Sequence, residues 1–461
     1  MSQVPGTTVP ALSHAPTVLL ASPARRELWL HALMLTLLGY AVLGKGWAYV
    51  GYPPLFIGEV LLAGGAAALV FSRLRGMPRA FPSIALLTMM AWGALRTIPY
   101  LSSFGIDAVR DAVIWGYGAF AFITFWYIAA RPHRLALVLR RYAQFAGIFL
   151  VAMPAAWALR FVLADAMPRW PWADVGIIDP KAGDVMVHLS GILAFWIAGI
   201  RGEVGAGRLL LLAACAGVIG SYERAGMVAF LLCFAVCAIL RPHRGQLHRL
   251  AAVVVIGLVV LAVTAIRLEA PSRGEAKTRE ISFEQFVANV LSLTSSTELG
   301  DLDNTRTWRL EWWHDIADYT LRGPYFWQGK GFGINLADDD GYQVKSDGSL
   351  RSPHSAHLTM LARAGVPGLA LWAAVQLSWA AAIFRCYLGA RRSGQSRWSD
   401  VFLFLLVYWL AFMANASFDV YMEGPMGGIW FWCIYGLGLG AIWIYQRNPG
   451  ILVQDADPHL A

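Results

Sequence analysis

The chain has 461 residues, of which 57% are hydrophobic and only 14% are charged, and its formal net charge is +8. Its mean hydropathy is +0.53. Soluble globular domains contain less apolar and more charged sequence, so the composition excludes an ordinary soluble protein. It indicates an all-α polytopic membrane protein.

Apolar segments of roughly 16 to 22 residues recur along the chain, and each is long enough to cross a hydrocarbon core of about 30 Å. Arg25 and Arg26 directly precede the first segment, without the pattern of a cleavable signal peptide, which is typical of an uncleaved signal anchor. We expect about twelve transmembrane helices, near residues 27–44, 54–72, 82–99, 112–130, 143–163, 184–200, 207–221, 224–240, 249–267, 366–384, 401–418 and 426–445.

Lys and Arg residues are distributed unequally over alternate connections. Seven lie in one set of short connections, namely Lys45, Arg96, Arg110, Arg160, Arg169, Lys181 and Arg224. The other set, with the two ends, holds nineteen: Arg25, Arg26, Arg73, Arg75, Arg79, Arg131, Arg134, Arg140, Arg141, Arg201, Arg208, Arg241, Arg244, Arg249, Arg385, Arg391, Arg392, Arg397 and Arg447. Short cytoplasmic loops carry such an excess, so both termini are predicted to be cytoplasmic. The net positive charge then reflects topology and requires no nucleic-acid partner.

This orientation places the only long connection on the non-cytoplasmic side. The predicted organisation is a cytoplasmic tail (1–26), nine transmembrane helices (27–267), a long periplasmic loop with short helices (268–365), three more transmembrane helices (366–445) and a second cytoplasmic tail (446–461). A loop of this length usually has a function. It contains none of the five cysteines, so neither a structural disulfide nor a thiolate metal site is expected.

The stretch "GVIGSYERAGMVAFLL" (217–232) interrupts an apolar run from Leu209 to Leu240. The run is too long for one span and too short for two full spans, so the hairpin is tight and Glu223 and Arg224 lie at or below the outer membrane surface. Ionisable residues at that depth usually face a polar cavity and mark a ligand site. The alternative is that Glu223 and Arg224 form an ion pair with only a structural role at the turn.

The long loop contains "NTRTWRLEWWHDIADYTLRGPYFWQGKGFGINL" (304–336). Residues 309 to about 317 are typical of an amphipathic helix, with Arg309 and Trp313 on one face. The glycine-rich continuation suits close backbone approach to a ligand or a tight return to the membrane, and its spacing is not that of a nucleotide-binding loop. An interfacial helix with Trp anchors is the structural alternative.

A third polar segment, "SPHSAHLTMLARAGVPG" (352–368), precedes the tenth apolar segment. Ser352 is predicted as the N-cap and Pro353 as the first helical residue, which puts His354 in the first turn. A helix N-terminus disfavours imidazolium, so His354 is expected to be neutral and able to accept a proton. His354 and His357 could also share a metal ion with the Asp338–Asp340 run, or be structural, but no third ligand has suitable spacing.

These segments together resemble the O-antigen ligase and O-antigen polymerase superfamily. The family motif H-[NSQ]-x9-G is matched by His354, Ser355 and Gly365, and an Arg at a tight periplasmic turn is matched by Arg224 in "ERAG". A further motif, an Arg four residues before a Trp and then a Pro and a Gly-x-Gly, is matched by Arg309, Trp313, Pro324 and residues 329–333, with Arg306 as a competing position.

The resemblance implies transfer of a glycan from undecaprenyl diphosphate to a hydroxyl acceptor, such as lipid A-core, at the periplasmic face of the bacterial inner membrane, without metal, nucleotide or other cofactor. Arg224 and Arg309, with Arg306 as an alternative, would bind the diphosphate, and His354 would act as general base. Glu223, His357, Trp313 and Gly365 would support them.

Alternatives remain on the sequence alone. A polymerase would have the same donor site and a second lipid-linked glycan as acceptor. A protein-directed oligosaccharyltransferase is chemically equivalent, and a flippase or exporter would explain the spans without needing His354.

Overall fold

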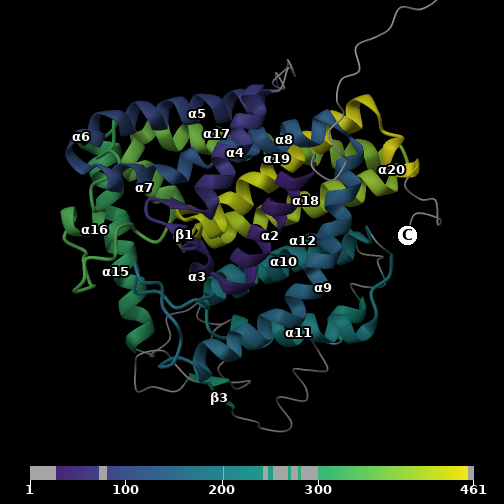
Figure 1. Cartoon of the computed structure of the whole chain (residues 1–461), viewed down its shortest axis with the longest axis horizontal. Helices are drawn as coiled ribbons and strands as arrows, with labels where there is room; N and C mark the ends of the chain where they lie inside the picture. The colour runs from purple at the N-terminus through teal and green to yellow at the C-terminus, as the bar shows by residue number, and fades with distance from the viewer. Residues whose placement is uncertain are drawn as a thin grey trace, which may run out of the picture.

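The computed structural model describes residues 27–71, 80–200, 202–241, 245, 248–252, 268–270, 279–281 and 300–454. In these ranges the protein is almost entirely helical (Figure 1). The first half contains α2 (Leu28–Leu43), α3 (Lys45–Ala48), α4 (Ile57–Phe71), α5 (Phe81–Thr97), η1 (Ile98–Tyr100), α6 (Leu101–Phe104), α7 (Ile106–Gly116), α8 (Ala119–Ala130), α9 (His133–Val162), α10 (Ala182–Ala198), α11 (Ala206–Gly220) and α12 (Arg224–Leu240).

The second half contains α15 (Gly300–Ala317), the π-helical turn η2 (Asp318–Arg322), α16 (Leu336–Asp339), α17 (Ala356–Arg392), α18 (Ser396–Ala416), η3 (Tyr421–Glu423), α19 (Pro425–Arg447) and α20 (Ile451–Gln454). Two antiparallel pairs of short strands complete the described structure, β1 (Gly51–Tyr52) with β2 (Leu55–Phe56) and β3 (Leu268–Ala270) with β4 (Arg279–Ile281).

Membrane-spanning helices are present where the apolar segments predict them. Five helices in the described ranges are long and apolar enough to cross a bilayer, and the bent pair of α7 and α8 gives a sixth. Five shorter apolar helices, α2, α4, α10, α11 and α12, coincide with further predicted spans. The predicted span at 249–267 lies largely outside the described residues. A polytopic helical membrane protein is therefore shown, while the number twelve stays a prediction.

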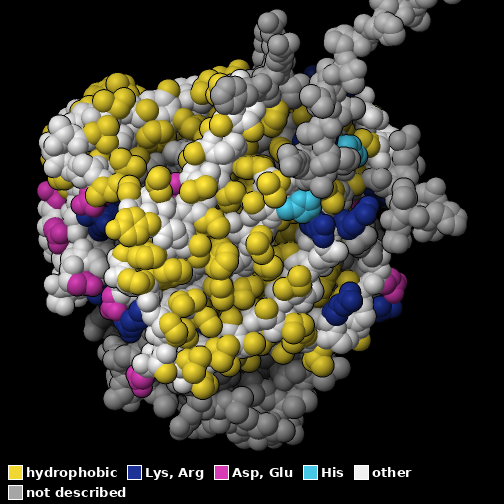
Figure 2. Space-filling view, in the orientation of Figure 1, with side chains coloured by type: hydrophobic (Ala, Val, Ile, Leu, Met, Phe, Trp, Pro, Cys, Tyr) yellow, Lys and Arg dark blue, Asp and Glu magenta, His cyan; other side chains and the backbone are white. Residues whose placement is uncertain are grey.

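Polar interactions separate into two ends of the helical bundle. At one end, Glu27 before α2 forms ion pairs with Arg131, which follows α8, and with Arg134 in the first turn of α9. At the opposite end of α2, the backbone amide of Lys45 donates to the carbonyl of Asp179 at 3.1 Å. Figure 2 shows charged side chains toward two opposite edges of the molecule, with a mainly apolar surface between them. The ion pairs of Arg131 and Arg134 and the contact of Lys45 thus lie at opposite ends of α2.

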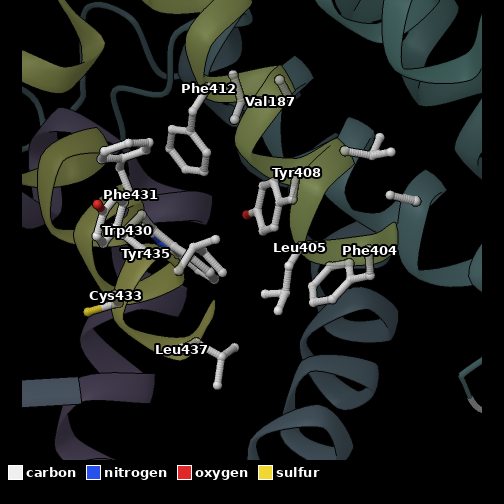
Figure 3. Close-up of a cluster of buried hydrophobic side chains, with 14 of the residues drawn as sticks. Val187, Phe404, Leu405, Tyr408, Phe412, Trp430, Phe431, Cys433, Tyr435 and Leu437 are labelled. Atoms are coloured by element: carbon white, nitrogen blue, oxygen red, sulfur yellow. The ribbon is translucent and has the colours of Figure 1, made fainter. Parts of the chain in front are cut away.

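The bundle core is formed by α19 with α8, α10 and α18. Aromatic side chains fill it, and Figure 3 shows Phe404, Tyr408 and Trp430 from α18 and α19 directed into the space between these helices. Glycine allows α8 to approach α19, because a Cβ on Gly436 would lie 2.3 Å from the carbonyl oxygen of Ala121. Close backbone approach at small residues is typical of membrane helix packing.

A compact cap formed by residues 300–355 lies at one end of the bundle, where α15 and α16 are seen in Figure 1. Its own small core consists of buried side chains from α15, α16 and α17, namely Trp312, Ile316, Leu336, Ala337, Leu350, Leu361 and Ala362. The cap is tied to α7 by Asp111, which forms 3.0 Å ion pairs with Arg351 and Arg363. The expected short helices in the long loop are therefore present, and α15 is longer than the predicted helix from 309 to 317.

Candidate active site

The segment that carries His354 differs from its predicted conformation. The helix α17 begins at Ala356, and Ser355, not Ser352, is its N-cap, with a side chain that accepts from the amide of Leu358. His354 lies before the cap, with a φ of 55°. This left-handed conformation is uncommon for a residue other than glycine, and such residues cluster at functional sites. The predicted placement of His354 in the first helical turn is therefore wrong.

Trp313 of α15 contacts the backbone just before the start of α17. Its indole Nε1–H donates to the carbonyl oxygen of Pro353 at 2.7 Å, which holds the backbone just before His354 against α15. The same indole packs near Phe418, with ring centroids 6.3 Å apart. Trp313 is thus a positioning residue for the histidine segment. The ring of Trp308, in the same helix, makes an aromatic contact with His354.

Arg309 lies on the same face of α15 as Trp313, as predicted. Its Nη1 donates to the carbonyl of Phe418 at 3.2 Å. Its Nε is buried and has no hydrogen-bond partner among the described residues. A guanidinium held at one nitrogen and unsatisfied at another can accept an additional anionic ligand.

Glu223 and Arg224 lie at the turn between α11 and α12. A Glu223 carboxylate oxygen accepts from the amide of Gly183 at the start of α10, at 2.5 Å. Gly183 makes this contact possible, because a Cβ there would lie 2.7 Å from the carboxylate. Arg224 is the first residue of α12. The side chains of Arg224 and Arg306 lie outside what the structure describes, so their predicted contacts stay predictions.

The charges of these segments act on one another. Burial lowers the pKa of His354 to about 4, and the positive charge of Arg309 acts in the same direction, while Asp419 opposes it. Burial also lowers the pKa of Arg309, whereas the negative charges of Asp419 and Glu223 act to raise it. Burial raises the pKa of Glu223 to about 7, an effect that Asp419 reinforces. His354, Arg309, Glu223 and Asp419 therefore form one electrostatic cluster.

His354 is neutral near pH 7, as the sequence predicts, but for a different reason. The prediction rested on the dipole at a helix N-terminus, whereas His354 precedes the helix and is neutral because of burial and the Arg309 charge. No hydrogen bond to its imidazole comes from the described part of the chain. The ring is consequently available to accept a proton from a ligand.

His357 has a different environment. Its Nδ1 accepts from the indole of Trp372 at 2.9 Å, and its Nε2 lies 3.2 Å from the hydroxyl of Ser417. An Nδ1 that accepts must be unprotonated, so the proton is on Nε2 and is donated to Ser417. Both nitrogens are engaged in these contacts, and the arrangement is that of a structural histidine.

Gly365 is required by the backbone. It interrupts α17 with a φ of 70°, and a Cβ there would lie 2.6 Å from the carbonyl oxygen of Phe326. The glycine-rich loop packs against this break, where the amide of Lys330 donates to Ala362 at 2.7 Å. The motif glycine therefore shapes the backbone that supports the site.

Two of the three aspartates considered above as possible metal ligands contact a lysine instead. The ammonium of Lys330 contacts the carboxylates of Asp339, at 2.5 Å, and Asp340. Within the described ranges, no group of three or more His, Cys, Asp or Glu side chains is arranged to hold a metal ion.

Two charged residues of the cluster were missed by the sequence analysis. Asp419 is buried between α18 and η3, and Lys181 precedes α10 and interacts electrostatically with Asp419, Asp184 and Glu223. Each is a charged residue next to the end of an apolar segment, which is a recognisable signal. Their proximity to His354 depends on how α10 and α18 pack, which no local pattern reveals.

A family model described as O-antigen ligase matches residues 209–373. The match includes α12, α15 and the first part of α17, and therefore contains Glu223, Arg309, His354 and Gly365. No curated protein matches the chain. The matched segment supports the resemblance to the O-antigen ligase superfamily that the three motifs indicate.

Proposed function

We propose that the protein is a membrane-embedded glycosyltransferase of the O-antigen ligase type, which moves a glycan from undecaprenyl diphosphate to a hydroxyl acceptor without a metal cofactor. The observation that carries this proposal is the pairing of a neutral, unbonded His354 with the incompletely satisfied guanidinium of Arg309 in one cluster. Such a site offers a proton acceptor and an anion-binding cation side by side.

Arg309 would bind the diphosphate of the donor. The planar guanidinium suits phosphate oxygens, and fixed cationic donors stabilise the charge that develops as the diphosphate departs. Arg224 at the start of α12 would contribute a second cation, with Arg306, one turn before Arg309, as the alternative. Placement of the turn at the membrane boundary would leave the polyprenyl chain in lipid.

His354 would act as general base. The acceptor hydroxyl oxygen forms a bond to the anomeric carbon, and the bond from that carbon to the diphosphate oxygen breaks, with its electron pair leaving on undecaprenyl diphosphate. The hydroxyl proton passes to the imidazole. General-base catalysis of this kind contributes about 10²- to 10⁴-fold in rate, and direct displacement inverts the anomeric configuration.

The cellular placement is part of the proposal. The distribution of basic residues supports cytoplasmic termini and a catalytic cluster that faces the periplasm of a bacterial inner membrane. There the partners would be the lipid-linked donor, a lipid A-core or other glycan acceptor, and the surrounding lipids.

The proposal is tested by complementation of a deletion strain. We expect wild-type protein to restore the finished surface polymer, and His354→Ala and Arg309→Gln to leave it absent at normal membrane levels. Arg322→Gln serves as the matched control, because Arg322 is 81% exposed in the same cap. Normal polymer with both site variants would overturn the catalytic assignment.

The same strain separates a ligase from a polymerase, which would have the same donor site. Accumulation of long, unattached polymer in the deletion strain supports the ligase, whereas a single attached repeat unit indicates the polymerase.

A further inference from the structure

An apolar groove, distinct from the catalytic cluster, lies between α2 and α9. Its volume is about 290 Å³, close to the lower end of the range for small-molecule sites. Its walls are side chains from five helices that include α8, α18 and α19; Phe404, Trp430, Cys433 and Leu437 in Figure 3 belong to them. None of the residues of the catalytic cluster lines it.

The groove opens toward the membrane-facing surface. Leu35 of α2 and Ile148 of α9 both line it and are 62% and 51% exposed. The part of α2 that lines it, from Trp29 to Leu38, extends roughly 13 Å along the helix axis. A groove of this shape can take an aliphatic chain that enters sideways from the bilayer.

The polar residues of the groove are concentrated toward one end. His31 follows Trp29 and Leu30 in the α2 lining, and Arg141, with Gln144 three residues later, follows Val138 and Leu139 in the α9 lining. Beyond them, the lining toward Leu38 and Ile148 is apolar. The groove therefore complements an amphiphile, whose polar head group would lie at the polar end and whose chain would lie along the apolar lining.

Arg141 is a cationic side chain in the lining of the groove. Its Nη1 donates to Gln144 at 2.9 Å, and the described residues offer it no carboxylate. Neighbouring arginines on the same end of the bundle differ, since Arg134 is paired with Glu27 and Arg241 with Asp400. The Nδ1–H of His31 donates to the carbonyl oxygen of Glu27 at 2.8 Å, so Nε2 of the neutral ring is an acceptor and Arg141 is the donor for an anionic group.

We propose that this groove binds one anionic glycerophospholipid of the bilayer, with its phosphate at Arg141 and an acyl chain between α2 and α9. A guanidinium to which the described residues offer no carboxylate complements a phosphodiester, and the apolar walls complement the chain. Figure 2 shows Lys, Arg and His side chains bordering the apolar surface on one side. The inference is independent of the proposed glycan transfer.

The test uses the full-length protein in detergent micelles, titrated with dioleoyl-phosphatidylglycerol or dioleoyl-phosphatidylcholine. Native mass spectrometry counts bound lipids, and thermal unfolding follows the stabilisation. We expect one phosphatidylglycerol to bind preferentially and to raise Tm. Arg141→Gln should weaken this binding about tenfold, and Leu35→Trp should block it by filling the groove.

Matched variants test the groove and its charge separately. Arg208→Gln removes an exposed guanidinium, and Leu210→Trp enlarges a leucine with 59% exposure, both on α11 and outside the groove. Both should bind phosphatidylglycerol like wild type. Unchanged binding in Arg141→Gln and Leu35→Trp would overturn the proposal, as would equal binding of the two lipids, or a protein dimer that Leu35→Trp disrupts.

Discussion

The indole of Trp372 donates a hydrogen bond of 2.9 Å to Nδ1 of His357. Three residues earlier, the described residues give the imidazole of His354 no such partner. Two histidines that are equivalent in the sequence are therefore different in the structure: one is part of the scaffold of α17, and the other is available to a ligand.

Trp372→Phe should act on stability and not on chemistry. The change removes the donor to a half-buried ring nitrogen, and an unsatisfied polar group of this kind costs about 1–3 kcal/mol. We expect a lower Tm in detergent and transfer activity that stays within a few fold of wild type. Loss of transfer at an unchanged Tm would show that His357 has a role in the reaction.

Gly365→Ala should destabilise the cap. A Cβ at φ 70° would be strained and would lie 2.6 Å from a backbone oxygen, and strain of this type costs on the order of 1–3 kcal/mol. Gly217→Ala in α11 is the control, since a Cβ there meets nothing within 4 Å. Thermal unfolding should show a lower Tm only for Gly365→Ala; equal Tm values for both variants would contradict the structure of the break.

Asp111→Ala should destabilise the protein more than Asp107→Ala. Asp111 neutralises Arg363, whose side chain is only 2% exposed, and removal of one partner of a buried ion pair costs about 3–5 kcal/mol. Asp107 is 41% exposed and its contact with Arg351 is long, at 3.7 Å. Membrane levels and resistance to heat aggregation should fall for Asp111→Ala alone. Similar behaviour of the two variants would argue against this anchor between α7 and the cap.

The pH dependence of transfer should reflect the low pKa of His354. Because the pKa of His354 is about 4, the ring is neutral at neutral pH and can act as a base there. This activity is lost as the ring becomes protonated, when the pH falls through about 4. We expect kcat/KM, which reports the free enzyme, to stay level from pH 8 to about 5 and to fall only below. The bound diphosphate offsets the Arg309 charge, so the acid limb of kcat should lie at higher pH. An acid limb of kcat/KM near pH 6.5 would contradict a buried base beside Arg309.

Much of the architecture follows from the sequence because apolar length and basic loops are strong physical signals. The predicted spans near α2, α5, α18 and α19 agree with the helices within a few residues. The start of α17 was not predictable in the same way, since Ser352 and Ser355 are both acceptable N-caps. The hydrogen bond from Trp313 to Pro353, between segments 40 residues apart, accompanies the later start.

Some residues of the candidate site are likewise predictable from the sequence, and others are not. Arg309 and His354 are recognisable from local spacing, and the structure places them in one cluster. Asp419 belongs to that cluster only because the loop after α18 packs beside α15, as the Arg309 contact with Phe418 shows. Tertiary packing of this kind has no signature in a single sequence.

The most direct test of the proposed chemistry is single-turnover transfer by purified protein in proteoliposomes, with a lipid-linked glycan donor and its acceptor. We predict that His354→Gln slows the transfer step about 10²- to 10⁴-fold while the affinity for the donor, measured separately, is unchanged. A His354→Gln protein that transfers the glycan at the wild-type rate would contradict the assignment of His354 as the base.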